Sequence, residues 1–184
     1  MSNDYTETLI TSRTAYQGKL LTLKEDQVKL PDGNSATREY VLHQGAAMVI
    51  ALFDDFSILL ERQFRFPARA HFLELPAGKI DPGEVPLATA RRELLEETGY
   101  SAKKWVKLAS FYPSPGYVGE KMNLFLALGL TEGKRELMED ERIETRWFSR
   151  KEIGEMIHAG KILDGKTIIG YFLWLDWLKH AARP

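Results

Sequence analysis

Apolar and polar positions alternate loosely over residues 19–30 and, after a Pro31-Asp32-Gly33 turn, over residues 36–43. This pattern predicts a β-hairpin near the N-terminus. Two denser apolar runs, residues 46–53 and 57–64, flank Asp54-Asp55 and have the β-branched and aromatic content of buried strands. Further strands are predicted at residues 71–75, 105–111, 122–130 and 144–148.

A helical period replaces the alternation between residues 86 and 98. Pro86 suits a first helical turn, Leu87, Ala90 and Leu94 recur on one face, and Gly99 stands where a C-terminal cap is expected. Helices are also predicted at residues 151–159 and 166–181. Together these elements predict an α+β fold, in which helices pack on a mixed sheet.

The composition narrows the chemistry. The 184 residues suffice for one domain with a small appendage. Because 25 Lys and Arg balance 26 Asp and Glu, we expect neither nucleic acid nor a membrane as a partner. The chain has no cysteine, which excludes thiolate catalysis and thiolate metal sites and fits a cytoplasmic location. The four histidines show no metal-ligand spacing, so oxygen atoms remain as candidate ligands.

Three glutamates fall within five residues of the predicted helix at 86–98. Glu93 and Glu97 are four residues apart and share a face, with Glu96 beside them. Repulsion between these carboxylates costs helix stability unless a cation neutralises their charge. Carboxylate oxygens suit Mg²⁺ or Mn²⁺. The alternative is a solvated helix face balanced by Arg91 and Arg92.

A longer pattern decides between these interpretations. Gly78 is followed after five residues by Glu84, and after seven more by the run Arg92-Glu93-Leu94-x-Glu96-Glu97-x-Gly99-Tyr100. This arrangement resembles the box of the Nudix hydrolase family. Tyr100 departs from the aliphatic residue that is more usual there, but nine positions at fixed spacing over 23 residues do not coincide by chance.

The resemblance implies a Nudix α/β/α sandwich that holds divalent metal ions, Mg²⁺ or Mn²⁺, against a diphosphate. It implies that Glu93, Glu96 and Glu97 are metal ligands, together with the backbone carbonyl of Ala77. Glu84 and Arg92 are expected to form an ion pair that orients the loop. We attribute Gly78 and Gly99 to backbone conformation.

The resemblance also implies the remaining catalytic groups. A loop glutamate is the expected general base, and Glu139 and Glu141 both fit, with Glu141 favoured; Glu97 is assigned to catalysis as well as to the metal. Arg65, in a run similar to that of the same family, is expected to reach the substrate phosphates. The alternative for Arg65 is a surface cation at a strand end.

The segment at residues 112–120 points to a substrate. Pro115 lies sixteen positions beyond Gly99 in a Ser-Pro-Gly-x-x-x-Glu setting, similar to the ADP-ribose pyrophosphatase branch of the family. The resemblance implies a nucleoside diphosphate sugar substrate, with Pro115 and Glu120 in its site. Turn formation alone would also explain two prolines and two glycines.

Residues 1–43 resemble the β extension that this branch exchanges across a homodimer, and residues 44–184 would form the Nudix hydrolase domain. Arg38 and Glu39 would then help to build the partner's substrate site; exposed positions on an edge strand are an equal alternative. Two rival functions remain: a nucleoside triphosphate or dinucleoside polyphosphate hydrolase, and a nucleotide-binding module without turnover.

Overall fold

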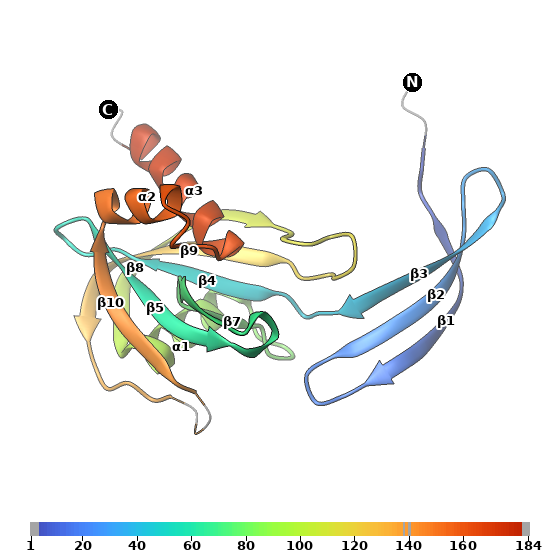
Figure 1. Ribbon diagram of the computed structural model, residues 1–184, viewed down its shortest axis with the longest axis horizontal. Coiled ribbons are helices and arrows are strands. Elements are labelled where there is room, and N and C mark those ends of the chain that lie inside the picture. The colour runs from blue at the N-terminus through green and yellow to red at the C-terminus, as the bar shows by residue number, and fades with distance from the viewer. Residues whose placement is uncertain (1–3, 138, 140, 182–184) are drawn as a thin grey trace.

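A computed structural model describes residues 4–137, 139 and 141–181. The first sheet is an antiparallel extension in the order β1-β2-β3, which projects from the rest of the molecule (Figure 1). Its strands are β1 (Thr8–Gln17), β2 (Thr22–Lys29) and β3 (Ser35–Leu42). The predicted turn is present: Leu30 N–H donates to Asn34 O at 2.8 Å, and Gly33 has φ 90°.

Two further sheets form the core. One has the order β10-β5-β6, and the other has the order β7-β4-β9-β8, in which β4 and β9 run parallel. Their strands are β4 (Ala46–Ala51), β5 (Ser57–Arg65), β6 (Ala70–Glu74), β7 (Ala77–Lys79), β8 (Tyr100–Phe111), β9 (Met122–Glu132) and β10 (Ile143–Ser149). A 3-10 turn, η1 (Phe66–Ala68), joins β5 to β6.

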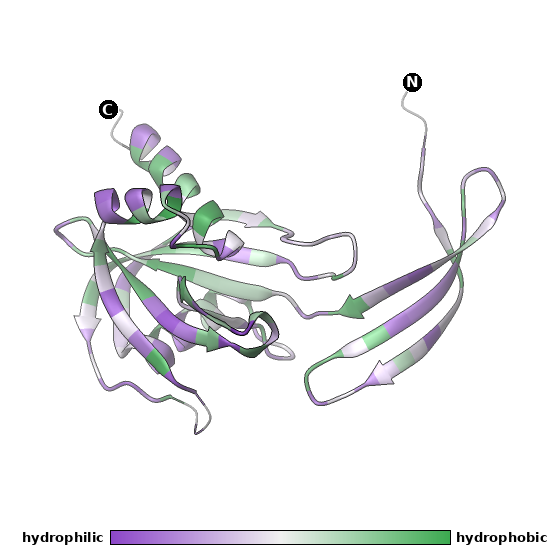
Figure 2. Cartoon of the chain, viewed as in Figure 1, coloured by the Kyte–Doolittle hydropathy of each residue, from purple (hydrophilic) through white to green (hydrophobic). Residues whose placement is uncertain are grey.

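Strand β4 is buried on both faces and separates two hydrophobic cores. Met48 and Ile50 pack on the side of α2 (Arg150–His158) and α3 (Gly165–Ala181). Val49 packs on the other side, against Ala90 and Leu94 of α1 (Pro86–Thr98). Figure 2 shows β4 as a hydrophobic strand between these layers. The α+β prediction, with helices on both sides, is therefore confirmed.

Local signals fix the ends of the helices. Gly99 ends α1 with φ 78°, and its N–H donates to Leu95 O at 2.8 Å. Ser149 and Glu152 form a reciprocal capping box at the start of α2. Asp164 Oδ2 accepts Thr167 N–H at 2.8 Å, and Thr167 Oγ1 accepts Leu75 N–H at 2.8 Å, which ties the start of α3 to the end of β6.

Three elements differ from the sequence expectations. Strand β1 was not predicted, because it is exposed along its whole length and shows no regular alternation. The short β7 was missed because Ala-Gly-Lys has little strand propensity. Strand β8 begins at Tyr100 rather than at Trp105, through pairing of its polar start with Thr131 and Glu132 of β9.

Candidate active site

Helix α1 presents two of its glutamates to a buried environment. Its apolar face packs on β4, which leaves Glu93 and Glu97 facing β7, with only 8% and 6% of their surface exposed. Burial raises the pKa of Glu93 against the lowering effect of Arg92. Burial also raises the pKa of Glu97, and the charges of Glu61, Glu93 and Glu141 add to that effect.

Gly78 lies directly against this pair. A Cβ on Gly78 would fall 1.8 Å from Glu93 Oε1, so only glycine leaves room for the carboxylate. Its φ is outside the left-handed region, unlike that of Gly99. The expectation that backbone conformation explains Gly78 was therefore wrong: the reason is the close approach of a side chain. Beside it, Ala77 N–H donates to Glu97 Oε2 at 3.1 Å.

Arg92 fastens the loop before α1 to the helix, as the sequence analysis expected. Its Nη2 donates to Glu84 Oε2 at 3.1 Å, and its Nη1 donates to Glu93 Oε1 at 2.7 Å and to Glu96 Oε2 at 3.1 Å. The Arg92 guanidinium lowers the pKa of Glu84 to about 2, with help from the Thr89 hydroxyl. Loop and helix thus form one hydrogen-bonded unit.

A hollow of about 480 Å³ opens beside these glutamates, at the end of the sheet where β4 and β9 begin. The expected residues Ala77, Glu93, Glu97, Glu120, Glu141 and Arg65 all line it. Five segments that are distant in the sequence therefore converge there: β5, β7, α1, the loop before β9 and the loop before β10.

Positive groups line the hollow together with the carboxylates. Arg65 donates to both oxygens of Glu74, at 2.9 and 2.7 Å, while 45% of its side chain stays exposed. Lys166, at the start of α3, lies 3.9 Å from Glu74 Oε2 and 2.6 Å from Asp164 Oδ1. A diphosphate entering this hollow would meet both carboxylates and cationic nitrogens.

Other predicted residues lie outside the hollow. Glu96 is held by Arg92 at its margin, and Glu139 is exposed, with its backbone carbonyl accepting Arg142 Nη1 at 2.7 Å. Pro115 lines a separate depression of about 260 Å³ with Tyr40 and Tyr112. Of the two candidates for the loop base, the structure brings only Glu141 into the hollow.

Arg38 and Glu39 sit on β3 in the projecting extension (Figure 1), and neither lines the hollow. Arg38 forms an ion pair with Glu7. Glu39 stands opposite Glu25 of β2. Both side chains are exposed, as expected on an edge of the extension.

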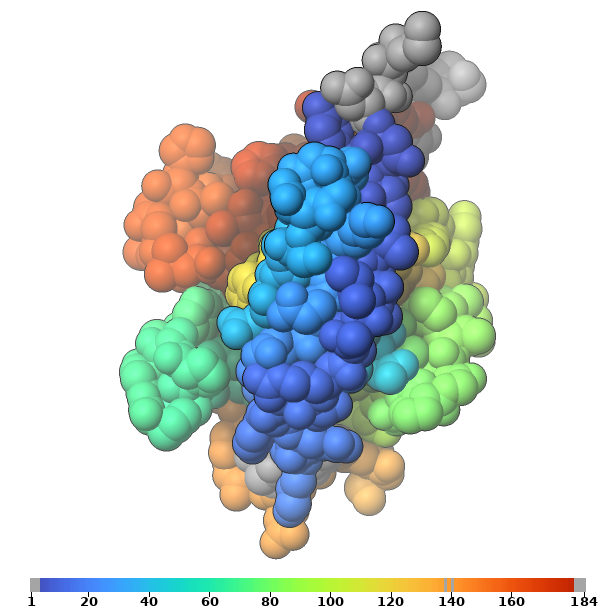
Figure 3. Space-filling model, turned by 90° about the vertical axis from the view of Figure 1, so that its right-hand side faces the viewer, coloured from blue at the N-terminus to red at the C-terminus, as the bar shows by residue number. Residues whose placement is uncertain are grey.

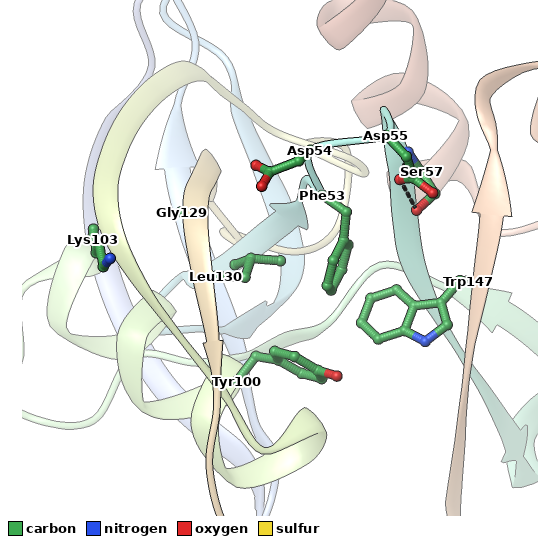
Figure 4. A pocket seen from close by; sticks show the side chains of 9 residues that line it. All are labelled: Phe53, Asp54, Asp55, Ser57, Tyr100, Lys103, Gly129, Leu130 and Trp147. Carbon is green, nitrogen blue, oxygen red and sulfur yellow. Dashed lines mark hydrogen bonds between the residues drawn. The ribbon is translucent and has the colours of Figure 1, made fainter.

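A second hollow lies elsewhere, and its chemistry differs. It measures about 600 Å³ and lies at the opposite end of β4 and β9, near Phe53 and Leu130 (Figure 4). Edge-to-face contacts join Phe53, Tyr100 and Trp147, with centroid distances of 3.8 to 5.5 Å. These rings pack against one another, whereas the smaller hollow gathers the buried carboxylates; we therefore take the smaller one as the candidate site.

Sequence reasoning missed several residues near the site. Gln63 and Lys79 line the hollow, as do Leu20 of the β1–β2 turn and Lys166 of α3. Nothing local marks these positions, because long-range packing brings them together. Glu61 is also close by, and it did carry a signal: a charged residue in the middle of an apolar run.

Comparisons with known proteins agree with this geometry. The model of the NUDIX domain family matches residues 42–168, and that of the nucleoside diphosphate sugar hydrolase N-terminal domain matches residues 7–41. The ADP-ribose pyrophosphatase of Bacillus subtilis (strain 168) is 41% identical over 179 residues, 96% of each chain. The methanol dehydrogenase activator of Bacillus methanolicus is 37% identical over 184 residues, 98% of this chain and 100% of the relative. A crystal structure of an ADP compounds hydrolase shares the fold, with a TM-score of 0.88 over the whole of both chains at 24% identity.

Proposed function

Because the chain belongs to the Nudix family, we propose that it is a divalent-metal-dependent pyrophosphatase acting on ADP-ribose and related nucleoside diphosphate sugars. The products would be a nucleoside monophosphate and a sugar phosphate. The observation that carries the proposal is the hollow itself, which gathers the buried pair Glu93 and Glu97 together with Arg65. The box of such a hydrolase is intact in this chain.

The donor atoms fit a hard divalent cation. Glu93 and Glu97 offer carboxylate oxygens in a buried position, next to the backbone of Ala77, and Gly78 leaves Glu93 the space it occupies. Among the described residues, no group of three or more His, Cys, Asp or Glu side chains is arranged to hold a metal ion. Mg²⁺ commonly takes one or two carboxylates together with waters and substrate phosphates, and Glu93 and Glu97 are the two on α1 that line the hollow.

Mg²⁺ bound there would polarise the phosphate oxygens and activate a water molecule. The protein's own groups supply the rest. Arg65, whose side chain is 45% exposed at the hollow, would bind the diphosphate. Glu141, which lines the hollow, would accept a proton from the attacking water, and Glu139 would take that role only if the loop rearranges. Glu96 would complete the ligand set by releasing Arg92.

The substrate class rests on two supports. The first is the relative named ADP-ribose pyrophosphatase, which matches nearly the whole chain. The second is the N-terminal family model, whose description names nucleoside diphosphate sugars. The relative from Bacillus methanolicus is named as a methanol dehydrogenase activator. Relatives that match nearly the whole chain therefore carry names for more than one activity. The rival assignment, a nucleoside triphosphate hydrolase, would leave the N-terminal extension unexplained.

We further propose that residues 1–43 form a dimerisation extension on a hydrolase domain of residues 44–184. Among described residues 8–42, only Asp26 and Val28 are buried, so this sheet has almost no core of its own. It meets the rest of the chain mainly where Val41 N–H donates to Tyr117 O at 2.8 Å. Viewed from its own side, it stands in front of the core (Figure 3). A second copy would cover its apolar side chains and receive Arg38 and Glu39.

The cytoplasmic location expected from the sequence stays a prediction, which fractionation of the producing cells would check. In the described part of the chain, no helix combines the length and apolar character needed to cross a bilayer.

The proposed activity is tested by following AMP release chromatographically from ADP-ribose, with and without Mg²⁺, beside GDP-mannose and ATP. We expect AMP from ADP-ribose only with the metal, and no cleavage of ATP. Glu97→Gln should lower turnover at least about 100-fold, because it removes a metal-binding charge. Cleavage of ATP alone would move the chain to the triphosphatase branch, and no turnover of any compound would favour a binding module.

Glu155→Gln provides the matched control for that substitution. Glu155 lies on α2, with 65% of its side chain exposed, and it pairs only loosely with Lys151 at 3.7 Å. The substitution Glu155→Gln removes the same charge from a helix outside the hollow. We expect wild-type turnover from this variant; an equal loss in both variants would show that the effect of Glu97→Gln is not specific to the site.

A further inference from the structure

Glu61 is a buried carboxylate with an unsatisfied oxygen. It lies on β5, only 3% of its surface is exposed, and its Oε1 accepts no hydrogen bond. A charged residue is rarely buried in this way unless it is paired or bound to a metal. Leaving a buried acceptor unsatisfied costs about 1–3 kcal/mol, and more when the group is charged. The position therefore calls for a partner that the protein atoms do not supply.

The alternation of side chains along β5 shows where Glu61 points. Ile58 and Leu60 belong to the core beneath α2 and α3, whereas Leu59 packs in the core beneath α1. Glu61 is two residues beyond Leu59 and shares its face. The next residues on that face, Gln63 and Arg65, line the hollow. Glu61 is therefore the inner end of a row that leads into the candidate site.

Burial raises the pKa of Glu61 to about 8, and neither of the two cations that attract it, Arg135 and Arg65, satisfies its Oε1. Its cross-strand partner Glu74 is a second carboxylate on the same face. Both oxygens of Glu74 already accept hydrogen bonds from Arg65, through Nε and Nη2. Glu97 and Glu141 are near enough to repel Glu61. Arg135 attracts it, yet the Nη2 of Arg135 donates to Ile143 O at 2.9 Å, and the buried Nε has no hydrogen-bond partner.

We propose that Glu61 supplies a further carboxylate to the divalent cation that Glu97 holds. The inference rests on the proposed metal-dependent function, and it adds a ligand from β5 to those that the sequence motif provides on α1. A cation shared by the two carboxylates satisfies the unpaired oxygen of Glu61 and removes the repulsion between them. Its binding would join α1 to the sheet of β5.

A purely structural role makes different predictions. If Glu61 mainly anchors Arg135, and through it the loop before β10, its neutralisation would leave Arg135 without a counter-charge and destabilise the fold. Metal binding would then be unchanged. If Glu61 serves the cation, neutralisation relieves repulsion in the metal-free protein and weakens metal binding. Stability without metal and affinity for metal therefore distinguish the two roles.

The experiment measures Mn²⁺ binding to the full-length protein without substrate, from the electron paramagnetic resonance signal of free Mn²⁺. In Glu61→Gln we expect affinity for Mn²⁺ to fall at least about tenfold. We also expect a higher melting temperature without metal and a smaller rise on adding Mg²⁺. Affinity within twofold of the wild type would overturn the inference, as would an unchanged Mg²⁺-induced rise.

Two further variants keep the test interpretable. Glu144→Gln removes a charge from the adjacent strand β10, where Glu144 is 58% exposed and lies 3.7 Å from Arg62; we expect wild-type Mn²⁺ affinity. Glu61→Asp keeps the charge and shortens the side chain. If Glu61→Gln does not fold, Glu61→Asp should still bind Mn²⁺ more weakly than the wild type, and equal affinity would overturn the inference.

Failure of the inference can be told apart from failure of the proposed function. Wild-type protein that binds no Mn²⁺ would overturn both. Wild-type protein that binds Mn²⁺ and is matched by Glu61→Gln overturns the role of Glu61 alone. Weaker Mn²⁺ binding by Glu61→Gln, in a protein that does not cleave ADP-ribose, would support the ligand role and reject only the proposed substrate.

Discussion

At the scale of single residues, the site depends on the missing side chain of Gly78 as much as on the carboxylates. The backbone of β7 passes so close to α1 that the Glu93 carboxylate occupies the volume of a Cβ on Gly78. A glycine in the motif therefore sets the position of a proposed metal ligand. The same contact explains why this glycine stands apart from Gly99, whose role is to end the helix with φ 78°.

We predict that Gly78→Ala lowers affinity for Mg²⁺ by on the order of 10- to 100-fold, because the new methyl group displaces Glu93. The change should appear as a shift of the Mg²⁺ concentration that gives half-maximal turnover. Gly165→Ala, at the start of α3, is the matched control, since a Cβ there meets nothing within 4 Å. Equal Mg²⁺ requirements in wild type and Gly78→Ala would contradict the displacement of Glu93.

The sequence predicted the residues of the motif well because their spacing is local. Glu93 and Glu97 share a helical face by the geometry of the helix alone, and the pairing of Glu84 with Arg92 spans a single loop. Glu61 and Lys166 were missed because their proximity to the hollow depends on pairing between β5 and β6 and on the docking of α3. No periodicity within one segment contains that information.

At the scale of elements, the loop before α1 and the helix are held together by charge. Glu84 accepts hydrogen bonds from Arg92 and from Thr89 Oγ1, the latter at 2.7 Å. No side chain caps the N-terminus of α1, where Val85 occupies the capping position. The carboxylate of Glu84 therefore ties this loop to the side chains of the helix, and its ionisation should be visible in the stability of the protein.

We predict that Glu84→Gln lowers the free energy of unfolding by about 1 kcal/mol at neutral pH. Because Arg92 lowers the pKa of folded Glu84 to about 2, the wild type gains stability from this group above the unfolded pKa near 4.5. That gain is lost as pH falls toward 2. The difference between the two proteins in urea unfolding should thus be constant from pH 6 to 8 and shrink below pH 4.5.

A difference that grew on acidification would contradict this account, because it would require a raised pKa. Asp55→Asn serves as the comparison. Asp55 accepts hydrogen bonds from Ser57 N and Oγ, at 2.9 and 2.6 Å, and these lower its pKa without any cationic partner (Figure 4). Its effect should decline in the same pH range. Only the Glu84 effect should weaken in high salt, because it depends on an ion pair.

Helices and strands were predictable from the sequence where one face is buried and the other exposed, or where both faces are buried. Strands β4 and β5 were identified from apolar runs because they lie at the centre of two cores. Strand β1 could not be identified in this way, because no described residue of it is buried. Its strand conformation comes from antiparallel pairing with β2. An apolar period in the sequence reflects the burial of one face, and a strand that is exposed on both faces shows no such period.

At the scale of the whole molecule, the extension is the part that a single chain leaves incomplete. It exposes large apolar side chains that the core does not cover: Leu9, Ile10, Tyr16, Leu20, Leu21 and Leu42. Such side chains on a thin sheet usually mark an interaction surface. Arg38 and Glu39 do not line the hollow of their own chain, and we have proposed that they serve the site of a second copy. Dimerisation and substrate binding are therefore expected to fail together.

We predict that Leu9→Glu, which places a charge where Leu9 is 57% exposed, converts the proposed dimer into monomers in multi-angle light scattering. Ser35→Glu adds the same charge at an exposed polar position opposite Lys29 and should remain dimeric. If Arg38 and Glu39 act across the interface, KM for ADP-ribose should rise with the fraction of monomer, while the far-ultraviolet circular dichroism of the core stays constant. A wild-type protein that is monomeric at all concentrations would contradict the proposed role of Arg38 and Glu39 in a partner's site.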